Sequence, residues 1–275
     1  MRDDHAAALA ALAQMNVRPP HYRYKTGALN IQPKHLMQAA ALADTSAARS
    51  NPLSFFLEHF AFFDLVSQNP DSGLLTGFFE PLVEASAQRT SDFPIPLYAP
   101  PDDLVQVADA DDTAQLPPGF RFARRREDGG LEPYFDRRAI EQGALDGRAQ
   151  PIAFVRDRVV AFFIHIQGAA CLIMPDGTRR RITYAAKSGH PFTGIGRMLI
   201  DRGAIAAADI SMQSIKAWLY ANPTHADALM WQNQSYIFFR QTDHLPDHPG
   251  PIAAAKVPLT PNRSIAVDRT VHTFG

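Results

Sequence analysis

The chain has 275 residues, and its 27 basic residues nearly balance its 28 acidic ones. A formal net charge of -1 gives the chain no bulk positive field to hold nucleic acid, so nucleic acid is not an expected partner. The length allows one large or two modest domains, and a hydrophobic fraction of 46% is typical of globular proteins that bury a core.

The longest strongly apolar stretch, residues 159–166, is far too short to cross a bilayer, so no membrane span is expected. The N-terminus begins with Asp3 and Asp4 rather than the basic residues of an export signal, and no lipid-attachment cysteine follows. The single cysteine, Cys171, lies in an apolar run and is expected to be a small buried side chain.

Residues 52–66 are predicted to form a helix, because aromatic residues recur there at spacings of three and four. The proline-rich segment 94–118 predicts a loop or linker, because proline lacks the donor that a central strand needs. Residues 152–155 and 159–166 are rich in branched and aromatic side chains and predict two strands. Residues 172–174 and 181–184 predict a hairpin that turns at Asp176 and Gly177.

Ser211 is predicted to cap a helix that ends near Asn222 and Pro223, and Thr224 is predicted to cap the next helix. A second polar and proline-rich segment, 243–251, precedes a last predicted strand at 264–267. The middle of the chain is therefore expected to be a β-rich unit with helices. The segments that flank it must either pair with each other or remain separate.

Most generic catalytic patterns are absent from the sequence. It has no phosphate-binding glycine loop, no complete dinucleotide fingerprint and no nucleophile elbow of a serine hydrolase. His244 and His248 have the spacing of a helical metal pair, but Pro246 between them breaks such a helix, which favours a solvated loop. These two histidines are therefore not expected to hold a metal ion.

The carboxylates are more informative. All six glutamates precede the predicted hairpin, so any acid from the second half of the chain must be an aspartate. Glu80 follows Phe78 and Phe79, and aromatic rings beside a carboxylate suit sugar binding, although a solvated acid at a strand end has the same pattern. Asp268 follows the predicted strand 264–267, where it is either an acid that faces a groove or a plain turn cap.

Ten ordered blocks carry a family resemblance that runs from residue 74 to the end of the chain. They include TGFFEP at 76–81, IQG at 166–168, YAAKSGHPF at 184–192, NQSYIFFR at 233–240 and RSIAVD at 263–268. In this order, the blocks resemble the membrane-bound lytic murein transglycosylase A family.

The resemblance implies a mainly β fold with helices. It implies a double-psi β-barrel domain from residues 51–105 and 246–275, with its C-terminal half incomplete. A second β-barrel domain is inserted at 106–245, and residues 1–50 form a helical extension. A sugar-binding groove is expected where the two barrels meet.

The resemblance also implies cleavage of the β-1,4 bond between N-acetylmuramic acid and N-acetylglucosamine in peptidoglycan, without water, to leave 1,6-anhydro ends. It implies a monomer in the periplasm that binds peptidoglycan glycan strands and needs no cofactor. The implied substrate-binding residues are Thr76, Gly77, Phe78, Glu80, Gln167, Gly168, Tyr184, Ser188 and Gly189.

The sequence departs from the family pattern in one important respect. The family's catalytic aspartate belongs to a motif of Asp, Thr or Val, Gly, Gly, which is expected beyond the block around Asp268 and is absent from this sequence. Asp268 is the matched acid that remains as a catalytic candidate. The alternative interpretation is a noncatalytic peptidoglycan-binding module or an inactive fragment.

Overall fold

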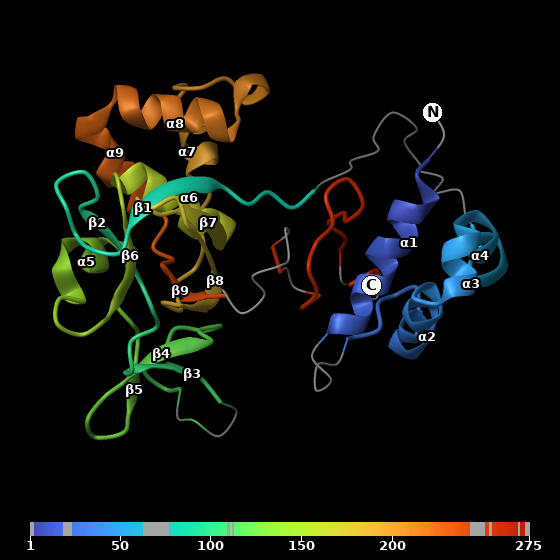
Figure 1. Cartoon of the computed structure of the whole chain (residues 1–275). Helices are drawn as coiled ribbons and strands as arrows, with labels where there is room; N and C mark the ends of the chain where they lie inside the picture. The colour runs from blue at the N-terminus through green and yellow to red at the C-terminus, as the bar shows by residue number, and fades with distance from the viewer. Residues whose placement is uncertain are drawn as a thin grey trace. The chain divides into compact units, whose positions relative to one another are not determined.

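The computed structural model describes residues 3–18, 24–62, 77–108, 111, 113–242, 251–252, 255–268 and 270–272. The chain forms two compact units, of which the first contains Met1–Phe79 and Leu245–Gly275 and the second contains Glu80–His244 (Figure 1). The two segments that flank the middle of the chain therefore belong to one unit.

The described part of the first unit is helical. It contains α1 (His5–Ala13), the short 3₁₀ helix η1 (Gln14–Val17), α2 (Pro33–Ala43), α3 (Ser46–Ser50) and α4 (Pro52–His59). Asp4, Thr45 and Asn51 each accept a hydrogen bond from a first-turn N–H and so begin α1, α3 and α4. Its described residues form no strand, and their β pairing is a bridge between Ile252 and Pro258.

The end of the chain packs against these helices. Val257 lies in one buried cluster with Met15, Tyr24 and Ala40, and the Tyr24 hydroxyl donates to the carbonyl of Ala255 at 2.6 Å. Backbone hydrogen bonds join Ala28 and Leu29 to the carbonyls of Thr270 and Val271. The first and last segments of the chain thus share a core and fold together.

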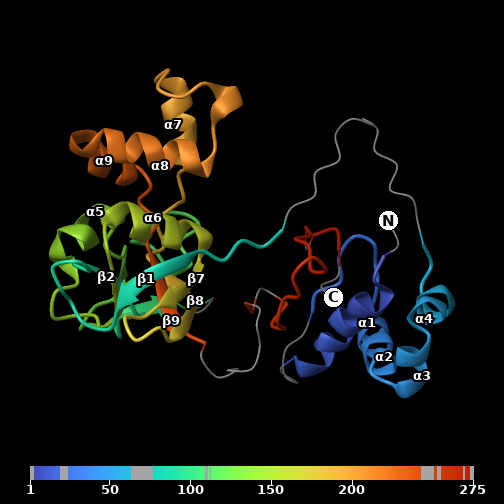
Figure 2. The same cartoon turned by 45° about the horizontal axis from the view of Figure 1, so that its top comes forward.

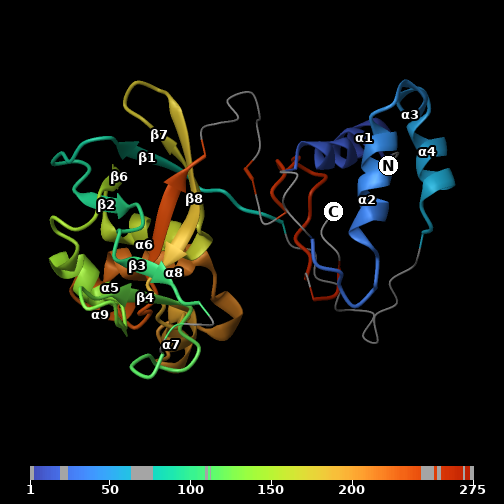
Figure 3. The same cartoon turned by 90° about the horizontal axis from the view of Figure 1, so that it is seen from below.

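The second unit is built on a six-stranded mixed sheet in the order β2-β6-β1-β7-β8-β9. The strands are β1 (Leu82–Ser86), β2 (Ile95–Tyr98), β6 (Pro151–Val155), β7 (Ala169–Ile173), β8 (Arg179–Lys187) and β9 (Ile237–Gln241). β1 and β7 are parallel, and the other neighbours are antiparallel. Figure 3 shows β8 beside β9 from below. Leu97 of β2 and Phe239 of β9 lie in the same buried cluster, so the sheet curls until its two edges share one core.

Residues 159–166 form most of a helix, α6 (Arg158–Gln167), and the predicted strand is wrong. Asp157 caps the helix by accepting from the N–H of Val160 at 2.9 Å, and Gly168 ends it with a positive φ of 72°. One face of α6 packs on the sheet through Ala161 and Ile164, and the other is covered by a second cluster. A helix buried on both faces is apolar all round and therefore loses the pattern that distinguishes it from a buried strand.

Helices α7 (Ile195–Asp201), α8 (Met212–Ala221) and α9 (Pro223–Met230) supply that second cluster, and Figure 2 shows them gathered on one side of the unit. A 3₁₀ helix, η3 (Ala207–Asp209), joins α7 to α8. Ser211 caps α8 in a capping box with Ser214, as predicted. The predicted cap at Thr224 is wrong by two residues, because Pro223 already occupies the first turn of α9 and Asn222 becomes the N-cap.

A small antiparallel sheet completes the unit, in the order β3 (Leu104–Gln106), β4 (Phe122–Arg125) and β5 (Leu131–Glu132). It joins the main body through a third cluster, in which Leu104 packs with Tyr134, Ile140 and Phe238. A short helix, α5 (Arg137–Ala139), and the following π-helical turn, η2 (Ile140–Ala144), lead from this sheet to β6. Together the two sheets and their helices make a mixed fold that is dominated by sheet.

Several other predictions are settled by the structure. The strand at 152–155 and the hairpin at Asp176 and Gly177 are confirmed as β6 and as the turn between β7 and β8. Cys171 is buried, as expected. The loop predicted at 94–118 is wrong in part: β2 contains Pro96 but pairs only with β6, and an edge strand tolerates a missing donor.

The predictions for residues 52–66, 264–267 and 244–248 have different outcomes. α4 ends at His59, where Phe60 takes an extended backbone, and residues 63–66 of the predicted helix lie outside the described residues. The strand predicted at 264–267 is wrong, because those residues pair with no strand in the described chain. The solvated loop predicted around His244 and His248 lies outside the described residues.

Candidate functional site

Four of the sequence-predicted sugar-binding residues come together where β1, β7 and β8 lie side by side. Glu80 lies just before β1, Gln167 and Gly168 end α6 just before β7, and Tyr184 lies on β8. The carbonyl of Pro81 accepts from the N–H of Cys171 at 2.9 Å, which ties the segment of Glu80 to the start of β7. The N–H of Tyr184 donates to the carbonyl of Gly168 at 2.7 Å. We refer to Glu80, Gln167, Gly168, Arg181 and Tyr184 as the Glu80–Tyr184 group.

An ion pair joins two charged side chains of this group, Glu80 and Arg181. A carboxylate oxygen of Glu80 lies 3.1 Å from Nε of Arg181, and the two side chains are 12% and 26% exposed. The pair fixes the direction of a carboxylate that is mostly shielded from water. The remaining lone pairs of the carboxylate can accept hydrogen bonds from sugar hydroxyls.

Tyr184 supplies an accessible aromatic ring to the group, because it is 40% exposed. Partial burial raises the pKa of its phenol, so the hydroxyl stays protonated and is a neutral donor near pH 7. The Nε2 amide of Gln167 approaches Sδ of Met212 at 4.0 Å, a weak contact that leaves the amide free to exchange partners. The group therefore places an aromatic ring, a carboxylate, a guanidinium and an amide on neighbouring segments of one sheet, and these are residue types that suit a polyhydroxylated ligand.

Ser188 and Gly189 occupy a different place in the same unit. Ser188 is completely buried, and its hydroxyl accepts from the N–H of Tyr236 at 3.1 Å. Gly189 has a φ of +87° and lies against the carbonyl of Phe122, so it joins β8 to the small sheet where no side chain fits. Both residues make contacts that hold the fold together.

The remaining predicted site residues belong to the first unit. Thr76 lies outside the described residues, and Phe78, just after Gly77, is 41% exposed. Asp268 is exposed and follows no strand; its carboxylate accepts from the N–H and hydroxyl of Thr270 at 2.8 Å and 2.6 Å. This is the turn-capping arrangement that the sequence allowed as the alternative to a groove acid.

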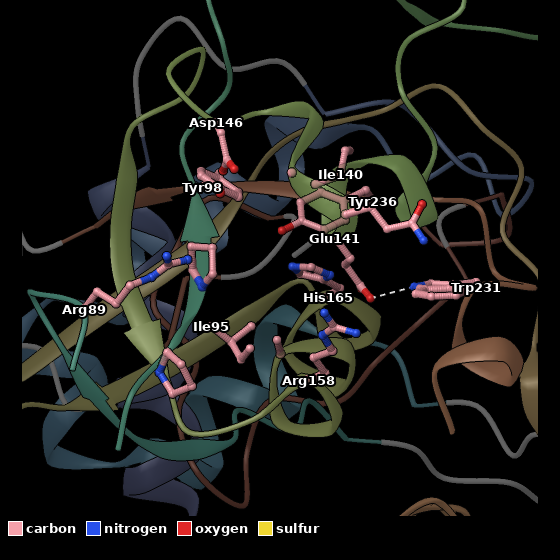
Figure 4. A pocket seen from close by; sticks show the side chains of 15 residues that line it. Arg89, Ile95, Tyr98, Ile140, Glu141, Asp146, Arg158, His165, Trp231 and Tyr236 are labelled. Atoms are coloured by element: carbon pink, nitrogen blue, oxygen red, sulfur yellow. Dashed lines mark hydrogen bonds between the residues drawn. The ribbon is translucent and has the colours of Figure 1, made fainter. Parts of the chain in front are cut away.

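A pocket of about 740 Å³ lies elsewhere in the second unit, and no residue of the Glu80–Tyr184 group lines it (Figure 4). Its walls come from β2, η2, α6 and the segment after α9. The polar side chains that line it include Arg89, Tyr98, Glu141, Asp146, His165 and Trp231.

Behind this pocket lies Arg137, which is fully buried. Its guanidinium donates to the carbonyls of Asn233 and Ser235 at 2.9 Å and 2.7 Å, and to Glu141 and Nδ1 of His165 at 3.1 Å and 3.0 Å. Burial lowers its pKa and the nearby carboxylate of Glu141 raises it, and we infer that the guanidinium stays charged because five donors and no acceptor suit this set of partners. The other carboxylate oxygen of Glu141 accepts from Nε1 of Trp231 at 2.9 Å.

The sequence analysis did not predict this pocket. His165 lies within the apolar run 159–166, and a histidine in such a run is the one signal that a buried polar contact was needed there. In the part of the chain that the structure describes, no group of three or more His, Cys, Asp or Glu residues is arranged to hold a metal ion. No helix within the described ranges is long and apolar enough to cross a membrane.

Comparisons with known proteins all match this chain to MltA proteins. Residues 74–240 match a family model described as the MltA specific insert domain. Over 201 residues, the chain is 29% identical to membrane-bound lytic murein transglycosylase A of Escherichia coli K12, which covers 71% of this chain and 46% of that protein. The corresponding protein of Vibrio cholerae is 28% identical over 205 residues, which cover 74% of this chain and 47% of the relative. The chain thus spans about half the length of these curated relatives.

Solved structures extend the similarity to the whole fold. A membrane-bound lytic murein transglycosylase from Agrobacterium tumefaciens superimposes with a TM-score of 0.82 at 39% identity, covering 99% of this chain and 75% of that one. MltA from Neisseria gonorrhoeae in a monoclinic form gives a TM-score of 0.70 at 30% identity, covering 94% of this chain and 68% of that one.

Proposed function

Because the chain belongs to the MltA family of lytic murein transglycosylases, we propose that it acts on the glycan strands of peptidoglycan. The observation that carries this proposal is the similarity to the Agrobacterium tumefaciens enzyme over 99% of the chain. The Glu80–Tyr184 group adds support from the residues themselves, because neighbouring segments of one sheet supply an exposed aromatic ring, an ion-paired carboxylate and guanidinium, and an amide.

The proposed reaction breaks the β-1,4 bond between N-acetylmuramic acid and N-acetylglucosamine without water. One protonated carboxylic acid donates its proton to the leaving glycosidic oxygen, and the C6 hydroxyl of the muramic acid attacks the anomeric carbon. The carboxylate then takes the proton of that hydroxyl, which leaves a 1,6-anhydro ring. A hydrolase needs a second carboxylate to attack or to activate water, whereas this reaction needs only one acid.

We assign sugar binding to the Glu80–Tyr184 group of the second unit. Thr76, Gly77 and Phe78 are separate sugar-binding candidates of the first unit. Asp268 is the candidate for the acid. We also propose, from the family resemblance, a double-psi β-barrel around residues 51–105 and 246–275, with residues 106–245 inserted as a second barrel. We further propose that the protein is a monomer in the periplasm.

The test is to incubate the purified chain with murein sacculi in ¹⁸O-labelled water and to identify the products by mass spectrometry. We expect 1,6-anhydro ends that carry no ¹⁸O and are one water lighter than hydrolysis products. Labelled reducing ends would mean that the protein is a hydrolase. Asp268→Asn is expected to abolish turnover if Asp268 is the acid, with Asp111→Asn, a partly buried aspartate of the second unit, as the matched control.

A second candidate function is a peptidoglycan-binding module without turnover. It is favoured by the exposed position of Asp268, whose carboxylate is engaged in capping the turn to Thr270. Binding to sacculi without any product, unchanged in Asp268→Asn, would support this function. A loss of binding in Tyr184→Ala would then show that the Glu80–Tyr184 group holds the glycan.

A further inference from the structure

Two helices of the second unit bring a methionine sulfur next to a side-chain amide. Sδ of Met212, in the first turn of α8, lies 4.0 Å from Nε2 of Gln167, in the last turn of α6. A thioether sulfur is only a weak acceptor, so the amide gains little from this contact. One oxygen atom bonded to Sδ and directed at the amide would lie about 2.7–3.2 Å from Nε2, which is the ordinary length of an N–H···O hydrogen bond.

Methionine oxidation adds such an oxygen atom. A peroxide, either hydrogen peroxide or an organic hydroperoxide, transfers one oxygen to Sδ and makes methionine sulfoxide. A lone pair of the sulfur attacks one peroxide oxygen, the O–O bond breaks and an S–O bond forms. The sulfur is oxidised by two electrons. The proton of the transferred hydroxyl passes to the leaving oxygen, which departs as water or as an alcohol.

Exposure to solvent limits which methionines a peroxide can reach. Within the described residues, three methionines are at most 4% exposed and therefore shielded: Met15, Met174 and Met230. Met37 lies in the first unit, far along the chain from the Glu80–Tyr184 group. In the second unit, Met198 of α7 and Met212 of α8 are partly exposed, and both pack against the cluster that covers α6.

The amide distinguishes Met212 from Met198. A sulfoxide oxygen that is partly buried needs a donor, because an unsatisfied polar group costs free energy. Gln167 supplies that donor at Met212, whereas the side chain of Met198 has no hydrogen-bond partner among the described residues. The sulfoxide of Met212 is therefore the one that the surrounding protein can hold in place.

We propose that Met212 is a site of reversible oxidation by peroxide, whose sulfoxide accepts a hydrogen bond from the side-chain amide of Gln167. Gln167 belongs to the Glu80–Tyr184 group, so this bond withdraws one amide N–H from the group and weakens its binding of glycan. The oxidation site itself depends only on the contact between the two side chains. Its effect on glycan binding rests on the proposed function.

The first experiment treats the full chain with hydrogen peroxide at pH 7 and follows the gain of oxygen in each methionine peptide by mass spectrometry. We expect Met212 to oxidise at least about fivefold faster than the shielded Met174 and Met230, because susceptibility follows exposure. Methionine sulfoxide reductases, one for each epimer, should reverse the change. Oxidation of Met212 at the rate of the shielded methionines would overturn the proposal.

The second experiment observes the new hydrogen bond through the ¹H–¹⁵N signals of the Gln167 side-chain amide, which are assigned by their absence in Gln167→Leu. Peroxide should shift one of the two amide protons downfield in the unmodified sequence. Met212→Leu, which keeps the volume of the side chain, should abolish the shift. Met198→Leu is the matched control in the same cluster and should leave the shift intact. Oxidised Met212 beside an unshifted amide would refute the proposal.

The effect on glycan is measured by calorimetry with chitohexaose before and after oxidation. We expect the affinity to fall about three- to tenfold in the unmodified sequence and in Met198→Leu, and to stay constant in Met212→Leu. An amide shift without a loss of affinity would refute the regulatory effect. If chitohexaose does not bind even before oxidation, the glycan assignment of the Glu80–Tyr184 group fails, and the amide shift still decides whether Met212 is the oxidation site.

Discussion

Replacing Arg137 with methionine tests whether the buried guanidinium organises the second unit. Methionine is similar in length and apolar, but it removes all four donated hydrogen bonds. The carbonyls of Asn233 and Ser235 lose a partner, and the carboxylate of Glu141, which is 12% exposed, loses its cation. Removing one member of a buried ion pair typically costs about 3–5 kcal/mol, and we expect a loss of that size in the free energy of unfolding. Against a total stability of about 5–15 kcal/mol, such a loss is severe.

The two tryptophans make the assay specific, because Trp218 and Trp231 both lie in the second unit. Their fluorescence during urea unfolding reports that unit. Arg197→Met is the matched control: its exposed pair with Asp201 on α7 is expected to contribute less than about 1 kcal/mol. The double variant Arg137→Met/Glu141→Leu removes both charges and should recover part of the loss. A loss below about 1 kcal/mol in Arg137→Met would refute the reasoning.

Three further predictions concern the same unit. Burial lowers the pKa of His165, so the folded state keeps the ring neutral, whereas the unfolded state takes up a proton below a pKa of about 6.5. The free energy of unfolding should therefore fall by about 2 kcal/mol from pH 7 to pH 5. His165→Gln should reduce this pH dependence in denaturant titrations, and an unchanged pH dependence would contradict the burial argument. Gly189→Ala should cost more than about 1 kcal/mol by thermal unfolding, because its φ is +87° and the carbonyl of Phe122 blocks a Cβ, whereas Gly119→Ala, at a φ of +83° in open space, should cost less. Asp157→Ala should lose about 1 kcal/mol with the N-cap of α6, and an unchanged urea midpoint would show that packing alone sets the start of this helix.

The contacts that build the candidate site join residues far apart in the sequence. The ion pair of Glu80 and Arg181 joins residues 101 positions apart, and it forms because β1, β7 and β8 are neighbours in the sheet. The network behind the pocket joins Arg137 to Ser235, 98 positions apart, through backbone carbonyls that any residue type would supply. No local pattern of residue types encodes such contacts.

Elements whose signals are local could be predicted from the order of the residues. The turn at Asp176 and Gly177 and the helix cap at Ser211 each depend on hydrogen bonds that span a few residues, and both predictions are confirmed. The ordered blocks from residue 74 onward also identified the family, since such motifs keep their order in the chain whatever the fold brings together.

The other features depend on contacts between distant parts of the chain. Residues 159–166 are apolar on every side because the sheet covers one face and α7–α9 cover the other, so only the burial on both faces shows that they form a helix. The same packing divided the predicted site residues: Tyr184 is accessible, whereas Ser188, four residues later on the same chain, is sealed against Tyr236. It also placed His165 beside Arg137, a contact between residues 28 positions apart that no local pattern encodes.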